Sequence, residues 1–207
     1  YAENVLIDNV IIENVSSSGS GAGIFMNYGA SVTLQNSVIR DNVSNMKGGG
    51  IIVAGQSALN IINTQITNNS AQDGGGIYIE EGSSTTINNS EISNNTATGD
   101  GYQNGGGVFI ESSNTETNTI VNIENSLIAN NICESGNSHG GGVSVLNQGA
   151  QLTIFNTIIR GNESNTGGGV YALNTDLSLE YCEVSLNKTS NDGGGVTISG
   201  NGDEHNI

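Results

Sequence analysis

Large aromatic residues and proline are scarce in this chain of 207 residues. It has no proline and no tryptophan, and aromatic residues make up only 4% of it. An ordinary compact core would need more large side chains. A stack of repeated coils needs fewer, because it buries only a narrow column of Ile, Val and Leu.

Positive charge is also scarce, with four Lys and Arg against 20 Asp and Glu and a net charge of −16. Binding to nucleic acid and to anionic membranes depends on basic residues. No stretch approaches the roughly 18 apolar residues of a membrane span, and no signal-peptide pattern opens the chain. We therefore expect no nucleic-acid partner and no membrane span.

What the chain does contain is a short phrase of three small residues followed by alternating β-type apolar residues. It occurs seven times, at 21–26, 48–53, 74–79, 105–110, 140–145, 167–172 and 193–198. Successive copies begin 27, 26, 31, 35, 27 and 26 residues apart. Such a period is typical of a solenoid coil and predicts one elongated domain over residues 1–207.

A second phrase follows each of the first six glycine phrases. In its first full copy, Val32 and Leu34 alternate with polar residues before Asn36, and Ile39 and Asn42 complete it. Alternation indicates strands with one face inward. We expect an all-β fold, a parallel β-helix of about seven coils with three short strands each, roughly 34 Å long.

Three sets of residues should stack from coil to coil. The inward Ile and Val should form the core. The second Asn of each copy should form a ladder of side-chain amides at a left-handed bend. The glycines should allow positive φ and close backbone approach at another corner. The ladder asparagines are Asn42, Asn69, Asn95, Asn131, Asn162 and Asn187.

The alternation of Gly-Gly-Gly-Ile/Val with Ile-x-x-Asn resembles the paired motifs of the polymorphic outer-membrane proteins of chlamydiae, Gly-Gly-Ala-Ile/Leu/Val and Phe-x-x-Asn. The chain has Gly where that family has Ala, as at Gly50, and Ile where it has Phe, as at Ile39. It is thus similar to the wider class of surface β-helix repeats with the pectin-lyase-like fold. The resemblance implies a right-handed helix and a secreted, adhesin-like, autotransporter-type passenger.

Three irregular segments interrupt the repeat, at 96–104, 112–119 and 132–139. The first and third leave the same corner of adjacent coils, so they should lie side by side. They carry Asp100, Tyr102, Glu134 and His139, which could bind a cation or a sugar or do acid–base chemistry, or be hydrated polar loops. Cys133 in this segment and Cys182 lie about two strand spacings apart, so both should be free thiols.

The outward position of the first strand carries large residues in five of seven coils, among them Phe25, Tyr78, Phe109 and Tyr171. We call this set the aromatic stripe. If exposed, it could stack on a glycan or pack against a surface protein of a host or neighbouring cell; the alternative is simple β-propensity on a covered face. Beside it, Glu80 and Glu111 occupy equivalent positions, where two carboxylates could share Ca²⁺, act as an acid–base pair or stay solvated.

These features favour an extracellular or cell-surface module that acts as an adhesin-like or structural stalk segment without an enzyme's chemistry. One alternative is a fibre in which copies associate head to tail, because the chain begins and ends inside the repeat. A polysaccharide lyase or hydrolase is another, although few basic residues are present to handle acidic sugars. Ice binding by the polar row that includes Thr33, Thr86 and Thr153 is a third.

Overall fold

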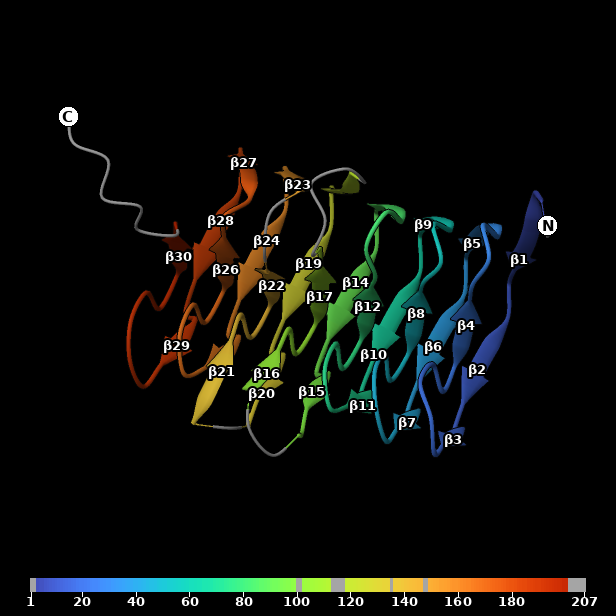
Figure 1. Ribbon diagram of the computed structural model, residues 1–207, viewed down its shortest axis with the longest axis horizontal. Coiled ribbons are helices and arrows are strands. Elements are labelled where there is room, and N and C mark those ends of the chain that lie inside the picture. Colours follow the sequence, from blue (N-terminus) through green and yellow to red (C-terminus); the bar gives the residue numbers. More distant parts are fainter. Residues whose placement is uncertain (1–2, 100–101, 113–117, 135, 147–148, 201–207) are drawn as a thin grey trace.

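The computed structural model describes residues 3–99, 102–112, 118–134, 136–146 and 149–200. Within them the chain forms a parallel β-helix whose coils stack one after another from the N-terminal to the C-terminal end (Figure 1). Four seven-stranded parallel sheets, here A to D, make up its sides. In the described part of the chain, no helix is long and apolar enough to cross a membrane.

The strands of each sheet recur once per coil. Sheet A contains β1 (Val5–Asp8), β5 (Ser31–Gln35), β9 (Ala58–Ile62), β13 (Ser84–Asn88), β18 (Thr119–Glu124), β23 (Ala150–Phe155) and β27 (Asp176–Glu180). Sheet B contains β2 (Ile11–Glu13), β6 (Val38–Arg40), β10 (Gln65–Thr67), β14 (Glu91–Ser93), β19 (Leu127–Ala129), β24 (Ile158–Arg160) and β28 (Glu183–Ser185).

The other two sheets differ in strand length. Sheet C contains β3 (Ser16–Ser17), β7 (Val43–Ser44), β11 (Ser70–Ala71), β15 (Thr96–Ala97), β20 (Ile132–Cys133), β25 (Glu163–Ser164) and β29 (Lys188–Thr189). Sheet D, which follows the glycines, contains β4 (Ile24–Met26), β8 (Ile51–Val53), β12 (Ile77–Ile79), β17 (Val108–Glu111), β22 (Val143–Leu146), β26 (Val170–Leu173) and β30 (Val196–Ser199).

Each coil contributes a fourth strand, which belongs to sheet C. The sequence predicted only three strands per coil. Its strands have only two residues each, so they cannot show the alternation by which a strand is recognised. Their inward positions are small: Ala71 and Ala97 are fully buried and Cys133 is nearly so. Cys133 and Cys182 are both free thiols, as expected.

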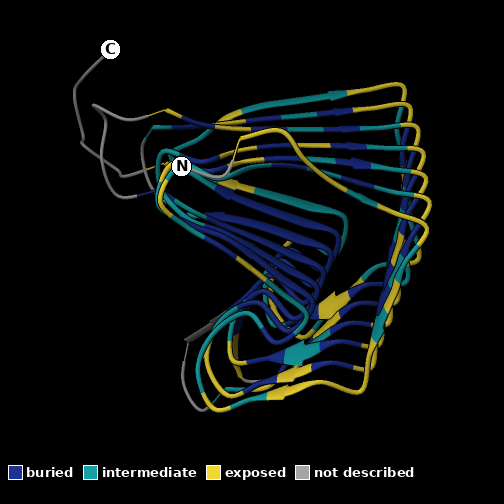
Figure 2. Ribbon diagram, turned by 90° about the vertical axis from the view of Figure 1, so that its right-hand side faces the viewer, coloured by how far each residue is buried: buried dark blue, intermediate teal, exposed yellow. Residues whose placement is uncertain are grey.

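The predicted core ladders are confirmed. Ile51 pairs in register with Ile24 and Ile77, and Ile66 pairs with Ile39 and Ile92. Figure 2 shows the coils stacked behind one another, with buried residues concentrated on the inner strands and exposed ones at the outer turns. Isoleucine, valine and leucine from sheets A, B and D form one continuous cluster along the helix.

The glycine triplets serve both expected purposes. The first glycine of a triplet has positive φ, for example +60° at Gly74. The others allow close approach: a Cβ at Gly49 would lie 2.4 Å from the carbonyl oxygen of Gly75, and one at Gly50 2.7 Å from that of Gly76. Larger residues would therefore push the coils apart at this corner.

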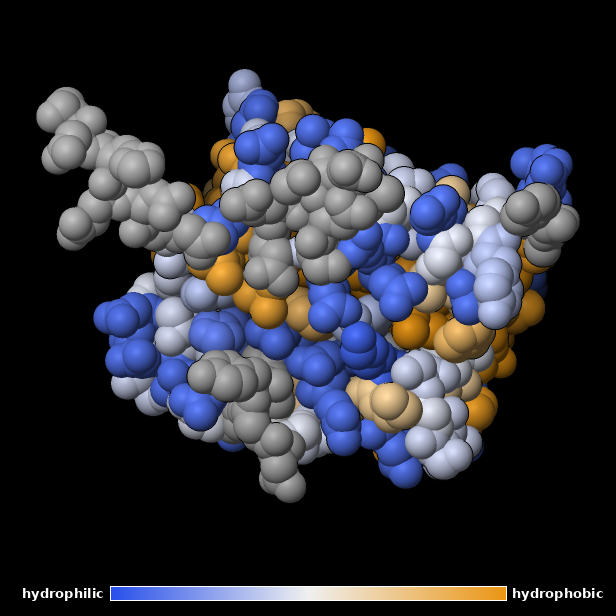
Figure 3. Space-filling view, viewed as in Figure 1, coloured by the Kyte–Doolittle hydropathy of each residue, from blue (hydrophilic) through white to orange (hydrophobic). Residues whose placement is uncertain are grey.

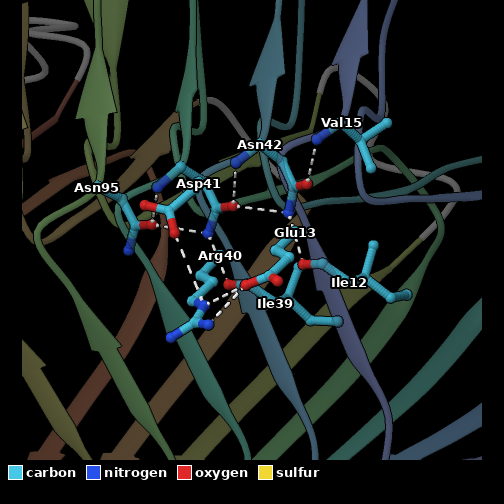
Figure 4. A network of polar contacts seen from close by, with 9 residues as sticks. Ile12, Glu13, Val15, Ile39, Arg40, Asp41, Asn42 and Asn95 are labelled. Carbon is cyan, nitrogen blue, oxygen red and sulfur yellow. Dashed lines mark hydrogen bonds and ion pairs between the residues drawn. The ribbon is translucent and has the colours of Figure 1, made fainter.

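The ladder asparagines from Asn42 to Asn162 are buried and Asn187 is half-buried, and hydrogen bonds join them from coil to coil. Figure 4 shows the part of the ladder around Asn42. The Asn69 side chain donates from Nδ2 to Oδ1 of Asn95 at 3.0 Å and to the carbonyl oxygen of Ile39 at 2.9 Å. The Asn95 Oδ1 also accepts from the Asn69 backbone N–H at 2.9 Å. The same pattern continues to Asn187.

The expectation that the ladder asparagines themselves adopt the left-handed backbone of the bend is wrong. Its asparagines do not have positive φ; the residue before each one does, such as Asn68 at 56° and Asn94 at 56°. The ladder asparagine therefore follows the bend and points its amide inward, where it satisfies the backbone groups of two coils.

The Asn95→Ala substitution should test the ladder. It removes the acceptor of the buried Asn69 N–H and one of the donors to the Ile66 carbonyl. A buried group without its partner costs roughly 1–3 kcal/mol, so we expect the free energy of unfolding to fall by about 2 kcal/mol. Urea denaturation measures it. Asn122→Ala, on the outward face of β18, is the control and should change it by less than about 0.5 kcal/mol.

Candidate functional site

The residue before each glycine triplet lies on the turn from sheet C to sheet D. In consecutive coils these residues are Lys47, Asp73, Asn104 and His139, which we call the corner row. Lys47 forms a parallel bridge with Asp73, and Asn104 pairs with His139. This row was not predicted from the sequence, because the residue type differs in every coil; the only signal was its constant place before the glycines.

At one end of the row, Lys47 joins two residues of sheet D. Its ammonium donates to the Tyr78 hydroxyl and to the Glu111 carboxylate, 3.1 Å away, and lies 4.5 Å from the centre of the Tyr78 ring. The Tyr78 hydroxyl also donates to Glu111. The positive charge, the phenol and the carboxylate therefore satisfy one another.

The middle of the row is a partly buried carboxylate. Asp73 Oδ1 accepts from the backbone N–H of Asn104 at 2.9 Å. Burial raises the pKa of Asp73 above its usual value, while the hydrogen bonds from Asn104 and the charge of Lys47 oppose this effect. Asp73 thus helps to hold the longer turn of the next coil.

At the other end, the imidazole of His139 stacks on the Tyr171 ring, with the ring centres 4.4 Å apart. Its Nδ1 lies 3.3 Å from Oδ1 of Asn104. Burial lowers the pKa of His139, because the charged imidazolium would lose hydration there.

The two insertions that leave this corner do lie side by side, as predicted. They form a separate two-stranded sheet, β16 (Tyr102–Asn104) and β21 (Asn137–His139). Asp100 lies outside the described residues, and the side chain of Tyr102 is also outside them. Of the predicted acid–phenol–imidazole group, Glu134 is exposed to solvent while His139 turns toward Tyr171. The site use of these residues stays a prediction.

Of the two alternatives for the aromatic stripe, the structure supports the covered face over most of its length. Tyr78, Phe109 and Tyr171 are 0%, 3% and 9% exposed, and only Phe25 is open, at 55%. The Tyr78 and Phe109 rings pack edge to face with centres 5.3 Å apart. They form a second, smaller core with Ile52 outside sheet D.

The physical reason is the turn between sheets C and D. Lys47 reaches the Tyr78 hydroxyl from this turn, and His139 covers Tyr171. The stripe therefore holds the turn against sheet D. On the face shown in Figure 3, hydrophilic side chains predominate and hydrophobic surface is broken into separate patches.

Glu80 and Glu111 take different partners. Glu80 accepts from the backbone N–H of Gly55 at 3.1 Å, whereas Glu111 binds Lys47 and Tyr78. Among the described residues, no group of three or more His, Cys, Asp or Glu is placed to hold a metal ion. A calcium site shared by these two carboxylates remains a prediction.

Comparison with known families decides the classification. The family model described as "Right handed beta helix region" matches residues 1–131 and 49–207, which together span the chain. The chain belongs to this family. No curated protein and no solved structure matches it. The match establishes a right-handed parallel β-helix, and it leaves the narrower resemblance to the polymorphic outer-membrane proteins as a prediction.

The burial of the aromatic stripe predicts a stability cost. Phe109→Ala should lower the free energy of unfolding by about 3–5 kcal/mol, because it opens a cavity beside Tyr78 in the smaller core. Phe25→Ala, at an equivalent but exposed position, should change it by less than about 0.5 kcal/mol. Urea denaturation compares the two. Equal effects would contradict the covered stripe.

The stability of the right-handed β-helix should depend on the charge of His139. Because its pKa is lower in the folded chain than the usual 6.5, the unfolded chain binds more protons between the two values. The contribution of His139 is therefore complete above about pH 6.5 and is lost as the pH falls toward the folded pKa. Melting temperatures measured across this range should fall less steeply for His139→Gln. An unchanged slope would show that His139 does not contribute.

Proposed function

We propose that this right-handed β-helix is a stiff structural module of an extracellular or cell-surface protein, a stalk or passenger segment of the adhesin-like kind. The observation that carries the proposal is the amide ladder from Asn42 to Asn187, which is buried up to Asn162 and joins six consecutive coils. Each rung ties its coil to the next through a side chain in addition to the strand hydrogen bonds. Bending the stack would have to break several of these bonds at once.

The burial and ion pairing of the polar side chains support a structural role over an enzymatic one. The residue types of acid–base chemistry are present in the corner row, but Tyr78 is fully buried and the Lys47 ammonium is occupied by Glu111. Arg40 is likewise paired with Glu13 at 2.6 Å (Figure 4). Lys47 and Arg40 are therefore not free to bind the acidic sugars on which such a lyase or hydrolase would act.

The surface location is supported by composition and by the resemblance of the repeats. A net charge of −16 favours solubility and disfavours contact with nucleic acid or anionic lipid. The glycine and asparagine phrases resemble those of surface passengers. Head-to-tail association into fibres is compatible with the same role.

Single-molecule stretching tests the stiffness directly. With pulling handles attached at residues 3 and 200, we expect high resistance followed by stepwise release of single coils. Asn95→Ala should lower the unfolding force of the coils around it, whereas Asn122→Ala should not. Smooth extension at low force, with no difference between the two variants, would refute the structural role.

Antibody labelling of the cells that produce the chain tests the location. Intact and permeabilised cells should be labelled equally, while a cytoplasmic marker of the same cells should need permeabilisation. Labelling only after permeabilisation would contradict an extracellular module.

A further inference from the structure

A second row of asparagines follows the outer corner between sheets A and B. Its members are Asn9, Asn36, Asn63, Asn89, Asn125 and Asn156, and Tyr181 occupies the same place in the last coil. All have positive φ, from 46° at Asn156 to 55° at Tyr181. Unlike the buried ladder, the asparagines from Asn36 to Asn156 are exposed, and their amides face solvent.

A shallow groove of about 610 Å³ runs along this outer row across four coils. Its floor holds buried hydroxyl groups such as Ser37 and Ser90, which donate back to carbonyl oxygens of their own turns. A second hollow of about 390 Å³ on sheet A, lined by Thr86 and Asn122, meets the groove at Asn89. The hydroxyl groups of the floor thus already have hydrogen-bond partners. A ligand would meet the amides at the rim of the groove.

The pairing of these amides is interrupted at Asn89. Asn63 donates to Asn36 at 2.8 Å, and Asn156 donates to Asn125 at 2.8 Å. Asn125 turns aside and donates to Asn88 at 3.4 Å. In the described part of the chain, the Asn89 side chain makes no hydrogen bond, so its donor and acceptor are both open in the middle of the groove.

An exposed aromatic pair continues the row at its C-terminal end. Tyr181, 82% exposed, packs edge to face against Phe155, with ring centres 5.3 Å apart. Tyr181 stands one coil beyond Asn156 in the row. Aromatic rings that are open on one face suit the C–H faces of sugar rings, with the hydroxyl left for a hydrogen bond.

We propose that this outer corner binds a linear, uncharged polysaccharide lying parallel to the helix axis. Amides recognise sugar hydroxyls as donors and acceptors, and their spacing of about 4.8 Å per coil is close to the length of one pyranose unit. The ligand is uncharged, because the groove contains Glu91 and no Lys or Arg, while Glu180 and Glu183 flank Tyr181. The repulsion disfavours acidic polymers. This site is distinct from the aromatic stripe and goes beyond the structural role.

Binding should be measured by calorimetry with uncharged β-linked glucan, mannan and chitin oligosaccharides, and with polygalacturonate as an anionic comparison. We expect at least one uncharged series to bind, with affinity rising over the first few sugar units and little changed by added salt. No binding by any uncharged series, or binding only of polygalacturonate or of a protein, would overturn the proposal.

Two pairs of variants locate the site. Tyr181→Asn and Asn89→Gly should each weaken binding about tenfold, which corresponds to a lost contact of ~1.4 kcal/mol. Tyr28→Asn and Asn68→Gly are matched controls, because both residues are exposed and have φ of 56° but lie at other corners. Equal losses in both pairs would refute this location.

Glycine accepts positive φ without strain, and asparagine is the residue of the other coils, so these variants should fold. Circular dichroism checks this. Backbone chemical shifts of the unmodified chain give an independent reading: titration with the binding sugar should move the signals of Asn63, Asn89 and Ser90. Shifts confined to sheet D instead would place the ligand at the aromatic stripe and overturn the assignment.

Discussion

The vertical hydrogen bond from one coil to the next is the constraint on which this structure depends. Each coil must lie one strand spacing from its neighbour, so every corner has to close within that distance. The buried asparagine ladder meets the requirement with side chains, since Asn95 bonds to the coil before it and to the coil after it. At the glycine corner, the backbones of neighbouring coils can approach to this spacing because residues such as Gly49 have no side chain.

This constraint explains why the coil period varies in some places and not in others. Extra residues are accommodated at the turn from sheet C to sheet D, where β16 and β21 form, because that turn projects outside the stacked strands. The turn from sheet B to sheet C has no such freedom. It must return the chain to the ladder asparagine, so a single left-handed residue such as Asn68 precedes that asparagine.

The sequence was sufficient to predict the parts of the fold that repeat with the same residue. Ile66 and Asn95 recur in phase, and the structure places both as expected. It was not sufficient for the two-residue strands of sheet C, which are too short to show a pattern. The cover of the aromatic stripe was also hidden, because Lys47 and His139 are different residues in coils of different length, and a turn that folds back leaves no periodic signal.

The buried ladder and the exposed outer row of asparagines differ in how far their side chains are fixed by neighbouring coils. This difference suggests where selection for binding can act. A buried rung such as Asn95 is determined by the coils on both sides, so replacing it disrupts the stack. An exposed rung such as Asn89 needs only a residue that tolerates positive φ, a condition that Tyr181 also meets. The outer corner can therefore change its side chains without changing the fold. The sheet D face cannot, because Tyr78 binds Lys47 of the turn and Phe109 is buried against Tyr78. This difference is why we assign recognition to the corner.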